Sequence, residues 1–167
     1  MKKFVVIDGN SLVHRAYHAL PPMNAPDGAP TNAIYGFLSM MFKMLEEERP
    51  DYLLAAFDTH APTPRHIRYE EYKAKRQPTA DDLRMQFPIL KALLEEMGIV
   101  VGEQDGYEAD DFLGIFSRRG QAAGVQVSLL TGDKDALQLV NEDVTVILMR
   151  KGISETLRYD EKAILEQ

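Results

Sequence analysis

Residues 3–10 read KFVVIDGN, an apolar run that stops at Asp8. Four consecutive apolar residues, Phe4 to Ile7, are typical of a β-strand covered on both faces, as in a parallel sheet. The pattern recurs in YLLAAF at residues 52–57, where the run stops at Asp58. Further strands are predicted at residues 99–101, 125–130 and 144–148.

Amphipathic stretches lie between the predicted strands and favour helices. They cover residues 11–20, 33–48, 81–97, 108–123 and 133–140. The start of another helix is predicted near residues 159–165. Strands that alternate with helices imply right-handed crossovers and a mainly parallel sheet with helices on both faces. We therefore expect one α/β domain of three layers.

Two features of the chain stand apart from this alternation. Residues 59–80 form a long stretch without strand character, and a segment of that length in a compact domain is usually functional or disordered. The large apolar side chains of the helix predicted at 33–48 are expected to pack in the core. They are Phe37, Met40, Met41, Phe42 and Met44.

The composition limits both the kind of site and its location. The 167 residues include no cysteine, which excludes disulfides and thiolate metal sites. The apolar run at the N-terminus is far shorter than a signal-peptide core or a membrane span. We expect a cytoplasmic protein whose metal ligands, if any, are oxygen or imidazole.

Charge is unevenly distributed. The whole chain carries −7, whereas residues 59–78 contain five Lys or Arg and two Glu, so that this segment is basic and the remainder strongly acidic. A chain of this kind can bind phosphates at one patch while carboxylates elsewhere hold metal.

Seven carboxylates follow predicted strands or open the helix after one. The carboxyl ends of parallel strands share one edge of a sheet, where ligands of open α/β folds bind. Converging carboxylates repel one another unless some protonate or cations bind. We interpret the set as an all-oxygen site for Mg²⁺ or Mn²⁺, and two such ions can promote a displacement at phosphorus. The seven are Asp8, Asp58, Glu108, Asp110, Asp111, Asp133 and Asp135.

Each acid also has a purely structural explanation. Asp8 and Gly9 form a common turn sequence, Asp58 can cap a loop, and Asp133 can be an N-cap. Acidic residues in the first turn of a helix, as in GYEADD at 106–111, are favoured by the helix dipole. The metal-site interpretation therefore depends on the acids occurring together.

Basic and aromatic residues indicate the substrate. Arg65, Tyr69, Tyr72 and Arg76 have helical spacing, and stacking rings interleaved with cations suit single-stranded nucleic acid. A solvated amphipathic segment is the alternative. Arg15 and Lys134, near acids in the sequence, can bind phosphate or simply be solvated. The four histidines have no metal-ligand spacing, and we assign them no ligand role.

Four motifs occur together in order. They are DGNSLVHRAYHALP, FDTHAPTPRHIRYEEYKAKR, GYEADD and TGDKDALQLV, which begin at residues 8, 57, 106 and 131. Together they resemble the 5′ nuclease domains of bacterial DNA polymerases I, within the flap-endonuclease and 5′-3′ exonuclease family. The resemblance extends over essentially the whole chain.

This resemblance implies a PIN-like fold and a metal-dependent nuclease acting at DNA 5′ ends or flaps in replication and repair, linked to polymerase domains. It places the seven acids at metal positions and implies an arch over residues 59–80. By resemblance, the catalytic residues are Asp8, Arg15, Lys73 and Arg76. The candidate DNA-binding residues are Arg15, Arg65, Arg68, Tyr69, Tyr72, Lys73, Arg76 and Lys134.

The chain also departs from the family pattern. Pro64 stands where phenylalanine is common, and His14 where tyrosine is frequent. The chain stops before a Gly-Asp-x-Ser-Asp-Asn stretch and a helix-hairpin-helix element, so we expect residues 1–167 to be an incomplete domain. One alternative is therefore a DNA-binding fragment with little turnover. An aspartyl-phosphate phosphatase is another, but Asn10 stands where those enzymes need a second acid.

Overall fold

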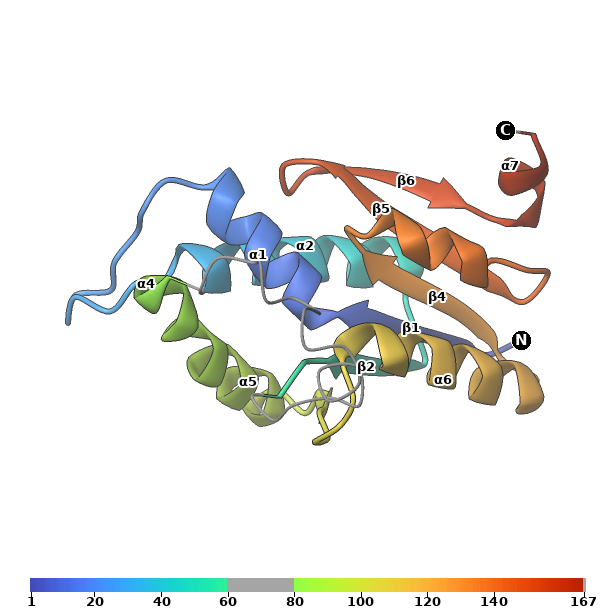
Figure 1. Ribbon diagram of the computed structural model, residues 1–167, viewed down its shortest axis with the longest axis horizontal. Coiled ribbons are helices and arrows are strands. Elements are labelled where there is room, and N and C mark those ends of the chain that lie inside the picture. Colours follow the sequence, from blue (N-terminus) through green and yellow to red (C-terminus); the bar gives the residue numbers. More distant parts are fainter. Residues whose placement is uncertain (60–79, 167) are drawn as a thin grey trace, which may run out of the picture.

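The computed structural model describes residues 1–59 and 80–166 and contains one six-stranded sheet with the order β3-β2-β1-β4-β5-β6 (Figure 1). Neighbouring strands are parallel from β3 through β5, and β6 is antiparallel to β5. The strands are β1 (Lys3–Asp8), β2 (Tyr52–Ala56), β3 (Val100–Gly102), β4 (Gln126–Thr131), β5 (Val144–Lys151) and β6 (Glu155–Tyr159).

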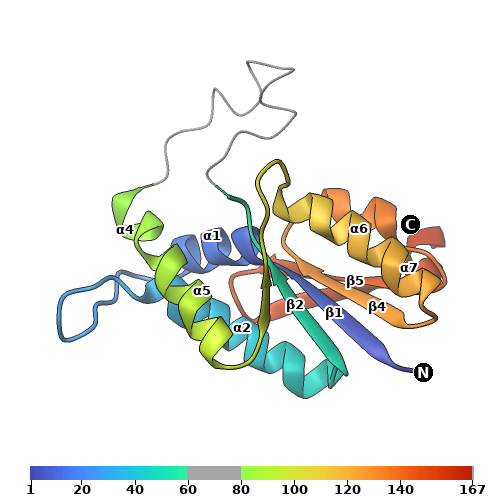
Figure 2. The same ribbon diagram turned by 90° about the horizontal axis from the view of Figure 1, so that it is seen from below.

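Helices cover both faces of the sheet, which confirms the predicted three layers (Figure 2). The predicted helix over residues 81–97 divides at Met85 into two. The helical elements are α1 (Gly9–Ala19), α2 (Asn32–Glu48), α4 (Asp81–Arg84), α5 (Gln86–Glu96), α6 (Ala109–Ala122), the 3₁₀ helix η1 (Lys134–Leu139) and α7 (Glu161–Leu165). Among the described helices, none is both long and apolar enough to cross a membrane.

The strand β6 is not among the strands predicted from the sequence. This strand reads ETLRY and has no continuous apolar run, because it lies at the edge of the sheet and carries polar side chains. Charged and polar residues are common on edge strands, where they discourage pairing with other chains. Residues 155–159 therefore form a strand because they pair with β5, although their own composition does not predict one.

The core follows the two-residue period of the strands. Val5 and Ile7 of β1 belong to the cluster under α1, α2 and α5, whereas Val6 packs in the cluster beneath α6. The predicted packing of the α2 methionines and Phe37 is confirmed. The prediction for Phe42 is wrong, because its side chain is 49% exposed. It lies 100° around the helix from Met41, outside the buried stripe.

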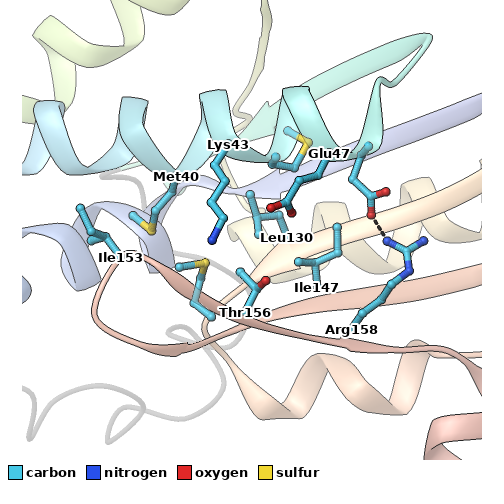
Figure 3. A pocket seen from close by; sticks show the side chains of 11 residues that line it. Met40, Lys43, Glu47, Leu130, Ile147, Ile153, Thr156 and Arg158 are labelled. Atoms are coloured by element: carbon cyan, nitrogen blue, oxygen red, sulfur yellow. Dashed lines mark hydrogen bonds and ion pairs between the residues drawn. The ribbon is translucent and has the colours of Figure 1, made fainter.

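The β5–β6 hairpin is fastened to α2 (Figure 3). The Lys43 ammonium donates to the carbonyl of Ser154 at 2.5 Å, and Arg158 pairs with Glu48. Between these two links lies a cavity of about 70 Å³, lined by apolar residues such as Met40 and Ile147 and by charged ones such as Glu47. The hairpin is thus held at a defined distance from the helical layer.

The strand order reverses direction beside β1. The chain builds β2 and β3 on one side of β1 and then crosses to build β4 and β5 on the other. Such a reversal leaves a crevice at the carboxyl ends of the two central strands, where open α/β folds bind their ligands. In this protein the crevice lies at the ends of β1 and β4.

Candidate active site

A crevice of about 540 Å³ lies at this reversal point. Six of the seven predicted acids line it, and they come from four separate segments of the chain. These acids are Asp8, Asp58, Glu108, Asp110, Asp133 and Asp135. The structure therefore brings together residues that are up to 127 positions apart in the sequence.

Asp8 is a buried carboxylate of the crevice, and its pKa is raised. The residue is only 5% exposed. It is the N-cap of α1, and its Oδ1 accepts a hydrogen bond from the Ser11 N–H at 3.2 Å. The Thr131 hydroxyl donates to its Oδ2 at 2.8 Å. Burial, with smaller contributions from Asp58 and Asp110, raises the pKa of Asp8 to about 6 despite these hydrogen bonds.

Asp58 joins the end of β2 to the start of α6. Its Oδ1 accepts from the backbone N–H of Ala109 at 2.5 Å. Its own N–H donates to the Asn10 side chain at 2.8 Å. A carboxylate at a helix N-terminus is stabilised by the partial positive charge of the helix dipole. Asp58 is thus held at the crevice by segments that precede and follow it in the chain.

The acids of GYEADD have two different placements. Glu108, 4% exposed, and Asp110 line the crevice. Asp111 lies at the third position of α6, where its carboxylate accepts from the Glu108 N–H at 2.8 Å. The structure therefore gives Asp111 a helix-capping contact in the first turn of α6.

Asp133 and Asp135 reach the crevice from the loop after β4 and from η1. The Asp133 side chain accepts from the Asp135 N–H at 2.9 Å, which makes Asp133 the N-cap of η1. The Asp133 N–H in turn donates to the Thr131 hydroxyl oxygen at 3.0 Å. The loop and the end of β1 are therefore connected through one threonine.

The carboxylates match a hard divalent cation in their chemistry, because such ions prefer oxygen ligands. The carboxylates lie farther apart than the ligands of a single bound ion. Within residues 1–59 and 80–166, no group of three or more Asp, Glu or His side chains could hold a metal ion as it stands. A cation would have to draw these side chains together or bind partly through water.

The predicted cationic residues are more dispersed. Arg15 lines a neighbouring groove rather than the acidic crevice, and Lys134 is exposed at the start of η1. The other six predicted DNA-binding residues lie outside the described residues, as does nearly all of the segment 59–80. They are Arg65, Arg68, Tyr69, Tyr72, Lys73 and Arg76.

Several residues of the site were missed by sequence reasoning. Asn10, Ser11 and Thr131 contact the acids directly, and Gly132 donates its N–H to the Ser11 hydroxyl at 2.8 Å. A Cβ on Gly132 would lie 2.9 Å from that hydroxyl and 3.0 Å from Arg15 Nε. The only sequence signal was their position within the DGNS and TGD stretches, beside predicted acids.

The fold is that of PIN-like 5′ nucleases, as two similar solved structures show. A structure described as divalent zinc ions bound to T5 5′-exonuclease aligns with 99% of this chain and 60% of that one, at a TM-score of 0.72 and 19% identity. A T5 D15 flap endonuclease in a pseudo-enzyme-product complex with DNA and metal ions aligns at a TM-score of 0.73 and 17% identity, over 99% of this chain and 60% of that one. These similarities establish the fold.

Residues 3–167 match the family model described as 5′-3′ exonuclease, N-terminal resolvase-like domain, and the chain belongs to that family. It is 44% identical to DNA polymerase I of Mycobacterium tuberculosis over 165 residues, which are 98% of this chain and 18% of the relative. A 5′-3′ exonuclease of Aquifex aeolicus is 44% identical over 147 residues, 88% of this chain and 51% of that protein. The chain thus spans about a fifth of its DNA polymerase I relatives.

Proposed function

We propose that this chain is the metal-dependent nuclease part of a DNA polymerase I and hydrolyses phosphodiester bonds at DNA 5′ ends or flaps. The observation that supports this most directly is the convergence of six carboxylates on one crevice at the reversal point of a 5′ nuclease fold. The family to which the chain belongs gives the same reaction class.

The crevice acids would hold Mg²⁺ or Mn²⁺, with Asp8 as the central ligand and Asp58, Glu108, Asp110, Asp133 and Asp135 around it. When bound, the metal would activate a water molecule and neutralise negative charge at the phosphorus centre. Asp111 stays a candidate for a supporting role, since it fixes the start of the helix that carries Glu108 and Asp110.

The chain's own cations would orient the DNA. Arg15 lies next to the crevice, and its planar guanidinium suits phosphate oxygens. Lys73 and Arg76 would contact the scissile phosphate or the strand beneath the arch, as the family resemblance implies. The 5′ single strand would be bound by further cations and would stack on two tyrosine rings. The cations are Arg65, Arg68 and Lys134, and the tyrosines are Tyr69 and Tyr72.

The test separates metal binding from cleavage. Titration of Mn²⁺ by calorimetry should show binding to the wild-type chain and none to the double variant Asp110→Asn/Asp133→Asn. The same double variant should lose cleavage of a 5′-flap oligonucleotide by at least about 10²-fold, the cost typical of removing a charge-stabilising group. Glu142→Gln, which removes an exposed acid before β5, should behave as wild type in both assays. Wild-type levels of Mn²⁺ binding in the double variant would refute the site.

A further inference from the structure

A second groove adjoins the acidic crevice and has the opposite charge. It has a volume of about 610 Å³ and lies between α1 and the tip of the β5–β6 hairpin. Arg15 and Lys151 contribute its two cationic side chains, and His14 and His18 contribute two imidazoles. None of the described residues that line it is acidic, which contrasts with the crevice next to it.

The groove and the crevice adjoin each other. Ser11, His14 and Gly132 line both of them. A ligand that lies across these three residues would have the carboxylates on one side and the cations on the other. Such a ligand must therefore suit a metal-binding centre at one end and offer negative charge at the other.

The hairpin tip is held in place rather than merely lying near α1. Arg15 Nη1 donates to the Gly152 carbonyl at 3.5 Å, and Lys43 of α2 donates to the Ser154 carbonyl. Gly152 adopts a left-handed conformation with a φ of 58°, which glycine reaches without steric cost. The backbone that directly follows Lys151 is thus held by contacts from both α1 and α2.

We propose that this groove binds backbone phosphates of the nucleic-acid strand that enters the carboxylate crevice, and that Lys151 is a phosphate contact. The proposal rests on the nuclease function proposed above. A lysine ammonium is a compact charge that binds phosphate oxygens, and Arg15 beside it can do so through two N–H groups. An extended polyanion fits two adjoining sites, because one strand can place successive phosphates in both of them.

The sequence gives a matched control for the hairpin charge. Arg150 is exposed and directly precedes Lys151, but it is absent from the described residues that line the groove. Lys151→Gln and Arg150→Gln therefore remove one positive charge each from the same hairpin. Lys151→Arg keeps the charge and should retain function.

Binding is measured by fluorescence anisotropy with the full 167-residue chain and a labelled 5′-flap DNA, without added divalent metal, over a range of KCl concentrations. Lys151→Gln should weaken binding about three- to tenfold at low salt and lower the slope of log K against log [salt] by about 0.7 to 0.9, the value for one phosphate contact. Arg150→Gln should stay within about twofold of wild type. Equal losses in the two variants, or no loss in Lys151→Gln, would overturn the proposal.

A methylphosphonate scan then locates the contact. Replacing single linkages near the cleaved bond by neutral methylphosphonates should identify one that weakens wild-type binding but leaves Lys151→Gln unchanged. If inorganic phosphate binds equally to wild type and Lys151→Gln and no linkage shows this coupling, the groove does not hold a strand.

Cleavage of the same DNA with Mn²⁺ separates the two proposals. DNA binding that depends on Lys151 without any cleavage would refute the nuclease function and leave the groove standing. Cleavage by wild type with unaltered binding in Lys151→Gln would refute the groove alone.

Discussion

The hydroxyl of Thr131 donates a hydrogen bond of 2.8 Å to Asp8 and accepts one of 3.0 Å from the backbone N–H of Asp133. Asp8 ends β1 and Thr131 ends the neighbouring parallel strand β4, so this contact joins the two central strands at the crevice. One buried hydroxyl therefore sets the orientation of the central carboxylate and of the loop that carries Asp133.

Thr131→Val should destabilise the protein by about 1–3 kcal/mol, because it leaves a buried acceptor on Asp8 and a partly buried donor on Asp133 without their partner. The hydrogen bond from Thr131 lowers the pKa of Asp8, so its loss should raise that pKa further. Urea unfolding and a carboxyl ¹³C titration of Asp8 measure the two effects. Thr131→Ser keeps the hydroxyl and should leave both the stability and the pKa of Asp8 near their wild-type values. An unchanged pKa of Asp8 in Thr131→Val would contradict the contact.

Asp8→Asn should stabilise the metal-free protein at neutral pH. The folded-state pKa of about 6 exceeds the ordinary value of 3.8, so ionisation of Asp8 opposes folding. The loss of stability begins as pH rises through about 4 and is complete above about 6, where it amounts to about 3 kcal/mol at most.

Unfolding in EDTA should therefore show Asp8→Asn more stable than wild type by about 1–3 kcal/mol at pH 7.5, with the difference shrinking towards pH 4. The amide keeps an oxygen to cap α1, which limits other losses. Glu142→Gln, an exposed acid, serves as the control for net charge. A gain that is the same at both pH values would exclude burial of the Asp8 charge as its cause.

Gly9→Ala should destabilise the protein by about 1–3 kcal/mol, because the added methyl group overpacks the junction of β1 and α1. Its Cβ would lie 2.5 Å from the Phe57 ring and 2.6 Å from the Ala56 carbonyl. Gly114→Ala is the matched control, since its nearest new contact is 3.7 Å away within α6. Thermal unfolding should show that variant stabilised by about 0.5–1 kcal/mol. Equal effects at both glycines would contradict the close approach at Gly9.

Gln86→Leu should cost about 2–4 kcal/mol, because the amide of Gln86 satisfies backbone groups in the core. Its Oε1 accepts from the N–H groups of Ala33 and Ile34 at the start of α2, and its Nε2 donates to Asn32 and to the Asp82 carbonyl. Denaturant unfolding measures the loss. Gln104→Leu, at an exposed loop position, should change stability by less than about 0.5 kcal/mol.

Much of the fold follows from the local pattern. The nearly continuous apolar runs at residues 3–7 and 52–57 identify central strands, because a strand buried on both faces is apolar along most of its length. Acids at the ends of such strands must meet at one edge of a parallel sheet, whatever the detailed packing. The sequence by itself therefore determined the layers, the site edge and all six acids that line the crevice.

Tertiary structure decided how individual side chains are used. Because α6 begins at Ala109, Asp110 lies at the crevice while Asp111 caps the helix, and a shift of one residue would rotate these roles by 100°. The contact between Asp8 and Thr131, and the place of Lys151 beside α1, depend on strand pairing between residues more than a hundred positions apart. Local sequence patterns carry no record of such pairing, because it is selected by the packing of the whole core.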